Sequence, residues 1–580
     1  ETAHPETTLR KEITVPTDKQ IDRRDFVAMG AAGALATSAA LSCGTAVAQG
    51  TSSIDFQLAR EGAWNFEIVP DPIAEDQISE VKEADVIVVG AGTSGLCTAV
   101  SAAEEGLSVI LFAMGAGPIG RGGSNFAFHS KYRESLGLEP IKPYPYLYQH
   151  MLGCTFDIDE DKWFKWYRNS ETTMNWMIDI MAETGEFDIN LEQVLHDNID
   201  EEGTPEYTPL GTHGWFLPDM PAVGDGQPLV TRRLAEKAAE LGVQLDFETR
   251  GLQLVRGGVP NGQEGRVEAI IARGPEGNLI KYVGTKAIVL ATGDFSRDRD
   301  MVAKYAPQAY DWITNFDVGE DFDPEAGKVY GGLYEGDGQK MGLWIGAAWQ
   351  KAFPNAAMAG TRFGGADDIG FIVNADGKRF MNESLCGTYA TTQYKHVHGG
   401  MMYQIWDSAY AQTGAPWPKR KTGYLTPLME PEEVTAGWDA KVEEGAYVKA
   451  DTLEELVETL GLPGSTLDEI ERYNGYCEAG VDGDFFKRPE FLRSITVPPF
   501  YGVAAEPKVT FLCLMGGLRT DIDMRVCDAD DQPIPGLYNV GTMVGDCYGN
   551  VYSLKLGGHN LGMNCICFGY LTGKFIAENE

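Results

Sequence analysis

Residues 84–113, ADVIVVGAGTSGLCTAVSAAEEGLSVILFA, decide the fold of this chain. The apolar run at 86–89 is typical of a buried parallel strand, and the run at 109–112 predicts a second one. Between them, residues 96–105 have the composition of a helix, which we expect to end at Gly106. A strand, a glycine-rich turn, a helix and a strand in this order predict the βαβ unit of an α/β fold.

Three glycines in the first turn, spaced Gly90-x-Gly92-x-x-Gly95, predict a dinucleotide site. Gly90 allows the tight turn, Gly92 lets backbone N–H groups approach a pyrophosphate, and Gly95 lets the helix pack closely on the strand. The pyrophosphate would lie at the helix N-terminus, beside Thr93 and Ser94. A βαβ turn without a ligand is the alternative.

One part of the usual dinucleotide site is missing. An acidic residue normally ends the second strand and holds a ribose hydroxyl. Here the strand ends in Phe112-Ala113-Met114, which has no carboxylate. We therefore expect backbone groups or Ser124 to hold the ribose.

Further glycine-rich segments follow in chain order, and each taken alone has an ordinary structural explanation. They are Gly122-Gly123-Ser124, the run 287–295 that contains Gly293, Glu335–Gly338, Gly377–Glu383, Gly536–Gly541 and the LGGHNL segment at 556–561. In this order they resemble the superfamily of FAD flavoproteins that contains fumarate reductases and 3-ketosteroid Δ1-dehydrogenases. The resemblance extends over about residues 84–580.

This resemblance implies a non-covalently bound FAD. The residues that it assigns to the cofactor are Gly90, Gly92, Thr93, Ser94, Gly95, Gly122, Gly123, Ser124, Gly293, Asp337, Gly541, Thr542, Asn560 and Leu561. It also implies a Rossmann-like, discontinuous FAD-binding domain at residues 81–345 and 505–580, with an inserted α+β capping domain at 346–504. Residues 49–80 would form a linker.

The positions at which fumarate reductases hold a dicarboxylate with His and Arg are changed here. The His that precedes Pro reads Phe353, and the His before the MGG turn reads Cys513. One Arg reads Gly387 and the other reads Lys555, which cannot form the planar fork of Arg. The alignment can slip by one or two residues at Gly387 and Cys513. A small dicarboxylate is therefore not the expected substrate.

The ketosteroid dehydrogenases provide a second template, in which a Tyr hydroxyl and a Gly amide polarise a ketone. The matching positions are Tyr552 and Gly558, with about two extra residues between them. Tyr389 or Lys555 would supply the proton. Each side chain has a plain alternative, a packed aromatic ring for the two tyrosines and a solvated charge for the lysine.

These positions predict an enzyme that reduces an activated C=C bond of an α,β-unsaturated carbonyl compound, lactone or acid. Hydride would reach the β-carbon and a proton the α-carbon. An expected lining of Phe353, Trp349, Phe363 and Phe126 suits a neutral substrate, polycyclic ones included. Two alternatives stay open: a 3-ketosteroid-type dehydrogenase working in the oxidative direction, and a flavin protein that only carries electrons. None of the histidines at 129, 213, 396 and 398 is singled out as a base.

The N-terminal residues 1–48 predict a twin-arginine signal peptide. Arg23-Arg24 precedes an uncharged stretch rich in Ala and Gly, which ends in the small residues Ala46-Val47-Ala48. An amphipathic helix, or a lipoprotein signal around Cys43, is the alternative. We therefore expect an exported protein in the periplasm or on the outer face of the cytoplasmic membrane.

The charge of the chain bears on its partners. Its 580 residues include 85 acidic and 47 basic side chains, a net charge of −38, which argues against a nucleic-acid partner. Exported members of the superfamily, the cardiac glycoside reductase type among them, receive electrons from a membrane-anchored cytochrome c in anaerobic respiration. We expect such a donor here, and the acidic surface could dock a cationic cytochrome.

The ten cysteines show no metal spacing. The sequence contains no C-x-x-C, no haem-attachment motif and no ferredoxin pattern. We therefore expect no metal site, although spacing alone does not exclude an iron–sulfur cluster built from scattered cysteines.

Overall fold

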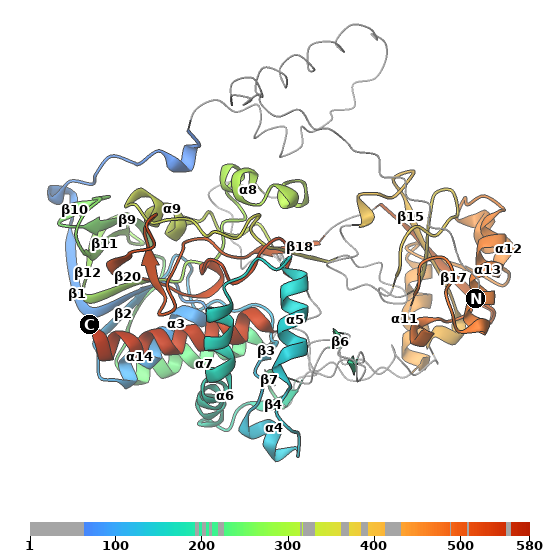
Figure 1. The fold of residues 1–580 in the computed structure, drawn as a ribbon, viewed down its shortest axis with the longest axis horizontal. Helices are drawn as coiled ribbons and strands as arrows, with labels where there is room; N and C mark the ends of the chain where they lie inside the picture. Colours follow the sequence, from blue (N-terminus) through green and yellow to red (C-terminus); the bar gives the residue numbers. More distant parts are fainter. Residues whose placement is uncertain are drawn as a thin grey trace, which may run out of the picture. The chain divides into compact units, whose positions relative to one another are not determined.

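The computed structural model describes residues 63–191, 197–199, 205–207, 211–218, 226–313, 316, 331–360, 370–383, 393–411, 431–487, 489–506, 510–552 and 558–580 (Figure 1). The chain divides into two compact units, residues 1–51 and 52–580, and every described residue belongs to the second. The predicted signal peptide at 1–48 therefore lies outside the described residues. None of the described helices is long and apolar enough to cross a membrane.

The described residues form one large sheet around the glycine-rich turn. Its strands are β10 (Val259–Pro260), β9 (Arg250–Arg256), β11 (Val267–Arg273), β12 (Leu279–Leu290), β1 (Glu80–Val89), β2 (Val109–Phe112) and β8 (Gln244–Asp246), in this order, with β20 (Pro533–Asn539) beside β12 and β19 (Arg525–Cys527) beside β20. Strands β8, β2, β1, β12 and β20 run parallel, whereas β11 and β9 add an antiparallel extension. Their parallel core is a Rossmann-like sheet, as the sequence predicted.

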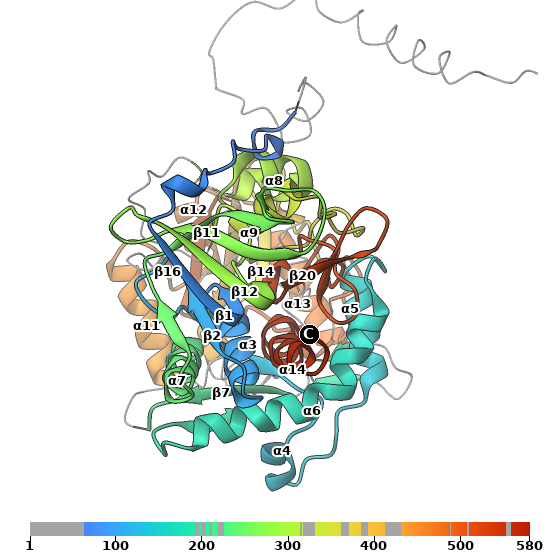
Figure 2. The same ribbon diagram turned by 90° about the vertical axis from the view of Figure 1, so that its left-hand side faces the viewer.

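Small residues let helices pack closely on the dinucleotide unit. Helix α3 (Thr93–Glu104) follows the turn, and its first ten residues are all buried. It lies beside α14 (Phe568–Asn579), as Figure 2 shows, and beside α7 (Gln227–Glu240). A Cβ atom added to Gly569 of α14 would lie only 2.7 Å from the carbonyl oxygen of Ser94. The N-terminal turn of α3 is thus held in place by the C-terminal helix of the chain.

A second, smaller sheet has its own core. Its antiparallel strands are β14 (Phe371–Asn374), β15 (Met402–Asp407), β17 (Phe500–Ala505) and β16 (Val448–Ala450), and the neighbouring helices are α11 (Pro431–Glu443), α12 (Leu453–Thr459) and α13 (Thr466–Ala479). Buried side chains such as Trp406, Tyr473 and Tyr501 form this core. The predicted fold class, a discontinuous Rossmann-like domain with an α+β insert, is confirmed. The bounds 346–504 stay a prediction, and β13 (Ala357–Gly360) within them pairs with β18 (Thr510–Leu514) outside them.

The remaining helices and strands complete the described structure. They are η1 (Asn65–Glu67), η2 (Glu75–Gln77), β3 (Asn125–Phe126), β7 (Thr212–Phe216) and β4 (Asp188–Leu191) in one small sheet, the pair β5 (Asp197–Ile199) and β6 (Pro205–Tyr207), α4 (Lys131–Ser135), α5 (Pro143–Gly153), α6 (Glu160–Ala182), α8 (Arg299–Tyr305), η3 (Pro307–Trp312), α9 (Asp337–Trp344), η5 (Ser408–Ala411), η6 (Pro489–Phe491), η7 (Gly541–Met543) and the π-helix η9 (Leu561–Cys567). The π-helix runs directly into α14 and packs against α6.

Candidate functional site

Each glycine of the first turn has a different environment. Gly90 has a φ of +119°, and a Cβ atom there would lie 2.3 Å from the carbonyl oxygen of Ala291. A Cβ atom on Gly95 would lie 2.0 Å from the carbonyl oxygen of Gly90, whereas on Gly92 its nearest neighbour would be 4.0 Å away. The first and third glycines are thus required by packing, and the second leaves open space for a ligand. Their contact with a cofactor stays a prediction.

The N-terminus of α3 has the features that favour a bound anion. Its N-cap is Gly92, which has no side chain to cap the helix. Within the described part of the chain, the backbone N–H groups of Thr93, Ser94 and Gly95 have no acceptor. Unpaired N–H groups and the helix dipole together favour a phosphate at this position.

Two further predicted glycines follow parallel strands on one side of β1, where β12 lies next to β1 and β20 lies next to β12. Gly293 comes after β12 and Gly541 after β20, both with positive φ, so the carboxyl ends of three adjacent parallel strands bring them together with Gly90. Their carbonyl oxygens accept hydrogen bonds from Gln339 Nε2 at 2.9 Å and Asn564 Nδ2 at 3.3 Å. The amide oxygens of these two side chains are buried and have no partner among the described residues.

The Gly122-Gly123-Ser124 loop is tied to the turn by Gln227, which the sequence did not single out. The Gly122 carbonyl accepts from the Gln227 N–H at 2.9 Å, and Gln227 Nε2 donates to Thr93 Oγ1 at 2.9 Å. Asn125 Nδ2 donates to the Gly123 carbonyl at 3.1 Å and to Gln227 Oε1 at 3.0 Å. No local motif marks Gln227, because its role depends on α7 packing against α3.

The other predicted cofactor positions have partners within the chain. The Asp337 carboxylate, at the start of α9, accepts from Arg250 Nε at 2.8 Å and Nη2 at 2.9 Å. This pairing raises the pKa of Arg250. The Thr542 carbonyl accepts from the Gly516 N–H at 2.7 Å, and Leu561 begins the π-helix. A direct contact of these residues with a cofactor stays a prediction.

The structure brings Tyr552, Gly558 and Asn560 together. Tyr552 is 5% exposed, and its hydroxyl oxygen accepts a hydrogen bond from the Asn560 N–H at 3.1 Å. Gly558 has a φ of +79°, and its carbonyl accepts from the N–H groups of Phe126 at 3.1 Å and Gly562 at 2.9 Å. The predicted Tyr389 and Lys555 lie outside the described residues.

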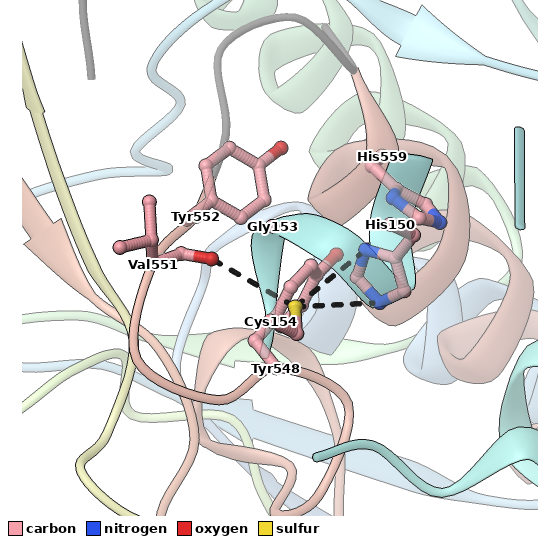
Figure 3. A pocket seen from close by; sticks show the side chains of 7 residues that line it. All are labelled: His150, Gly153, Cys154, Tyr548, Val551, Tyr552 and His559. Carbon is pink, nitrogen blue, oxygen red and sulfur yellow. Dashed lines mark hydrogen bonds between the residues drawn. The ribbon is translucent and has the colours of Figure 1, made fainter. Parts of the chain in front are cut away.

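A narrow recess lies beside Tyr552 (Figure 3). It is lined by His150, Gly153, Cys154, Tyr548, Val551, Tyr552 and His559, and these side chains leave no room for a water molecule. His150 Nε2 donates to the Cys547 carbonyl at 2.9 Å, and the Cys154 thiol donates to the Val551 carbonyl at 3.7 Å. Burial lowers the pKa of His150 to about 4, and it also lowers the pKa of His559, so both rings are neutral near pH 7.

These two histidines were not predicted as site residues from the sequence, although His559 lies inside the LGGHNL segment. His559 is 1% exposed, and its ring centroid lies 4.3 Å from that of His150 and 4.4 Å from that of Trp166. Only the packing of α5 and α6 against residues 558–567 brings the three rings together.

The described dicarboxylate positions provide no cation. Phe353 is 57% exposed, and the Cys513 thiol lies 3.8 Å from the sulfur of Met515. Burial raises the pKa of Cys513, so this thiol is neutral near pH 7. Gly387 lies outside the described residues, as Lys555 does.

Part of the expected substrate lining is wrong. Phe126 is fully buried, with its ring centroid 4.2 Å from that of Tyr146, so it belongs to the core and does not line an open site. The ring of Trp349 stacks on Tyr305 at 3.8 Å and donates its N–H to Asn355 Oδ1. The fourth expected residue, Phe363, lies outside the described residues.

Metal ligands do not gather in the described residues. No group of three or more His, Cys, Asp or Glu side chains there is placed to hold a metal ion. The eight cysteines that the structure describes are all free thiols.

Comparisons with known proteins place the chain among flavoproteins. Residues 85–135 and 198–560 match the family described as FAD binding domain. The vinyl phenol reductase of Lactiplantibacillus plantarum is 25% identical over 84% of this chain and 94% of its own length. A fumarate reductase (cytochrome) of Shewanella frigidimarina is 26% identical over 85% of this chain and 77% of its own length.

A solved structure shares the fold. The 3-ketosteroid-Δ4-(5α)-dehydrogenase of Rhodococcus jostii RHA1, in complex with 4-androstene-3,17-dione, superposes with a TM-score of 0.63 at 21% identity. The match covers 87% of this chain and 99% of that one. At this identity the match shows the fold alone.

Proposed function

The chain belongs to the FAD binding domain family, the superfamily of fumarate reductases and 3-ketosteroid dehydrogenases, and on that premise we propose that it reduces an activated C=C bond of a neutral substrate. It is an FAD-dependent oxidoreductase acting on CH–CH bonds. The observation that carries the proposal is the 3.1 Å hydrogen bond from the Asn560 N–H to the Tyr552 hydroxyl, which brings Tyr552 to the segment that contains Gly558.

The residues present fit FAD. Three unpaired N–H groups at the start of α3 suit the pyrophosphate, and the open space beside Gly92 admits it. The unpartnered amide oxygens of Gln339 and Asn564 suit a ligand rich in hydroxyl and N–H donors. When bound, FAD supplies the hydride for the reduction.

The chain's own residues would stabilise the charge that develops on the substrate. As hydride reaches the β-carbon, negative charge grows on the carbonyl oxygen, and the Tyr552 hydroxyl and the Gly558 N–H would bind that oxygen. A single donor of this kind typically contributes ~2.7–4 kcal/mol. The Asn560 N–H polarises the Tyr552 hydroxyl and holds its direction. Tyr389 or Lys555 would deliver the proton to the α-carbon, a role typically worth about 10²–10⁴-fold in rate.

Two features support a neutral substrate and the reductive direction. The described clamp positions carry a phenylalanine and a neutral thiol, which do not attract a dicarboxylate. Both relatives described above are reductases by name. An unsaturated carbonyl compound or lactone, polycyclic ones of the cardiac glycoside type included, fits this chemistry.

The N-terminal sequence extends the proposal to a cellular role. A twin-arginine signal at residues 1–48 would place the enzyme in the periplasm or on the outer face of the cytoplasmic membrane. A membrane-anchored cytochrome c would then supply electrons in anaerobic respiration.

The alternative function is a 3-ketosteroid-type dehydrogenase that runs the same chemistry in the oxidative direction. The Tyr552 and Gly558 pair supports it equally, because a donor to a ketone oxygen assists both directions. The direction in which electrons flow through the flavin separates the two functions.

The test is an anaerobic titration of the purified, FAD-loaded protein. The flavin is reduced with dithionite, and a panel of unsaturated ketones, lactones and acids is added in turn, with the saturated analogue of each as a control. Return of the oxidised flavin absorbance with one unsaturated compound alone supports the proposal, and Tyr552→Phe should slow that return. Bleaching of oxidised flavin by a saturated ketosteroid, without any reoxidation by alkenes, would establish the dehydrogenase instead.

A further inference from the structure

In the sequence, His559 lies between Gly558 and Asn560, the two residues that connect this segment to the proposed oxygen-binding groups. On one side Gly558 carries the candidate N–H donor, and on the other the Asn560 N–H donates to the Tyr552 hydroxyl at 3.1 Å. The His559 side chain is thus attached to the backbone between Gly558 and the N–H that contacts Tyr552. His559 is not one of the site residues that were predicted from the sequence.

The ring itself is held by aromatic packing. Its centroid lies 4.3 Å from that of His150, which comes from α5, and 4.4 Å from that of Trp166, which comes from α6 (Figure 3 shows the histidine pair). Tyr548 adds an edge contact at 5.8 Å. His150 is in turn fixed by its 2.9 Å hydrogen bond to the Cys547 carbonyl. The imidazole thus joins the start of the C-terminal helical segment, at residues 559–560, to two helices that are far away in the sequence.

The contact depends on ring shape and not on hydrogen bonding. Neither ring nitrogen of His559 has a hydrogen-bond partner in the part of the chain that the structure describes. The ring is 1% exposed, so water does not reach it either. A phenylalanine ring would keep the ring-to-ring contacts, although it is one ring atom larger than the imidazole.

We infer that His559 is a positioning residue whose ring, packed against His150 and Trp166, holds the Gly558 N–H and the Tyr552 hydroxyl at the geometry that binds the substrate oxygen. The inference rests on the proposed function for its effect on catalysis. The inference also states that the ring holds the backbone of Asn560 and Gly562 in place, and this statement does not depend on the proposed function.

The kinetic test compares three variants of the FAD-loaded enzyme. His559→Ala should lower kcat by about 10²-fold, the size of the loss of one oxygen-binding donor, with KM changed little. His559→Phe should recover most of the rate, because the ring contacts remain. The matched control is Leu254→Ala, which creates a cavity at a buried position of β9. This variant should keep the wild-type kcat. A control that loses as much rate as His559→Ala, or a His559→Phe enzyme that stays slow although it melts at the wild-type temperature, would overturn the inference.

A double-mutant cycle separates positioning from general destabilisation. If His559 acts through the Tyr552 hydroxyl, His559→Ala should cost much less in a Tyr552→Phe background than in the wild type. If the rate losses of the two single variants multiply fully in the double variant, His559 and Tyr552 act independently. That result would reject the inference and leave the proposed function intact.

Hydrogen exchange keeps the inference testable if the enzyme reduces no alkene, which would defeat the proposed function alone. In the FAD-loaded protein, His559→Ala should speed exchange of the Asn560 and Gly562 amides, both of which are hydrogen-bonded. His559→Phe should leave this exchange unchanged. Equal protection in His559→Ala and wild type would show that the ring does not hold the loop.

Discussion

At the scale of single residues, the three glycines of the turn differ in what a methyl group would meet. A Cβ atom on Gly95 would overlap the Gly90 carbonyl at 2.0 Å, so no small shift can accommodate it. Gly92 has an ordinary φ of −78° and open space beside it. Gly95 is therefore required for folding, whereas Gly92 is required only for a ligand that approaches the backbone.

This difference predicts opposite behaviour for two similar substitutions. Gly92→Ala should fold with the melting temperature of the wild-type apoprotein but bind FAD more weakly, because the methyl group occupies the space for the pyrophosphate. Gly95→Ala should lower the apoprotein melting temperature by several degrees. Thermal denaturation without FAD, and titration with FAD, measure the two effects. If Gly92→Ala binds FAD as tightly as the wild type, the pyrophosphate does not bind beside Gly92.

Buried histidines predict an acid sensitivity at the same scale. Burial lowers the pKa of both His150 and His213 to about 4, below the value near 6.5 expected in the unfolded chain. Between these values the unfolded chain binds more protons, so stability falls as the pH drops from 6.5 towards 4. Each histidine should cost about 3 kcal/mol once the pH is below 4.

Urea unfolding between pH 4.5 and pH 7 measures this loss. The wild type should lose stability over the range, and His213→Gln should lose less, because it lacks one of the buried histidines whose pKa is lowered. A wild-type stability that does not change with pH would show that these rings are protonated, or exposed, in the folded protein.

At the scale of elements, the contact between α3 and α14 depends on glycine in the C-terminal helix. A Cβ atom on Gly569 would lie 2.7 Å from the Ser94 carbonyl and 2.9 Å from Cys97 Cβ. Because Ser94 belongs to the first turn of α3, a displaced α14 would move the predicted anion site as well. The helix that closes the chain therefore shapes the start of the dinucleotide unit.

Two glycine substitutions in helices test this packing. Gly569→Ala should destabilise the protein by about 1–3 kcal/mol through overpacking. The matched control is Gly437→Ala in α11, an exposed position where a Cβ atom would meet nothing within 4 Å. That control should instead stabilise by about 0.4–1 kcal/mol. Chemical denaturation measures both, and equal effects would show that α14 has room for the methyl group.

At the scale of the whole molecule, the chain combines separate hydrophobic cores with a large negative charge. One core packs the helices on the large sheet, and another belongs to the insert. We expect most of the charged side chains behind the net charge of −38 to lie at the surface, because charged groups are rarely buried without partners. A charge of this size acts over distance and affects the encounter with a partner more than the fold.

We expect reduction of the flavin by a cationic c-type cytochrome to slow as ionic strength rises, since salt screens the attraction between opposite charges. Stopped-flow measurements from low to physiological salt would show it. Reduction by dithionite, a small anion, is the control and should not slow with added salt. A cytochrome rate that is insensitive to salt would exclude electrostatic docking.

The sequence by itself determined the local part of this protein. The strand, turn and helix at residues 84–113 could be predicted because apolar runs and glycine spacing act over a few residues. The order of the glycine-rich segments also led to the right fold class and to the flavoprotein superfamily. The prediction failed at Phe126, because this aromatic residue was expected to line the site but lies in the core.

Only the tertiary structure decided which distant residues meet. Gly90, Gly293 and Gly541 converge because β1, β12 and β20 are neighbours in the sheet, an order that no local pattern encodes. Gln227 reaches Thr93, and His559 reaches His150, through helices that pack side by side. Backbone preferences depend on residues that are near one another in the sequence. Contacts between side chains depend instead on how segments far apart in the sequence pack together, and this packing brings the residues of the candidate site together.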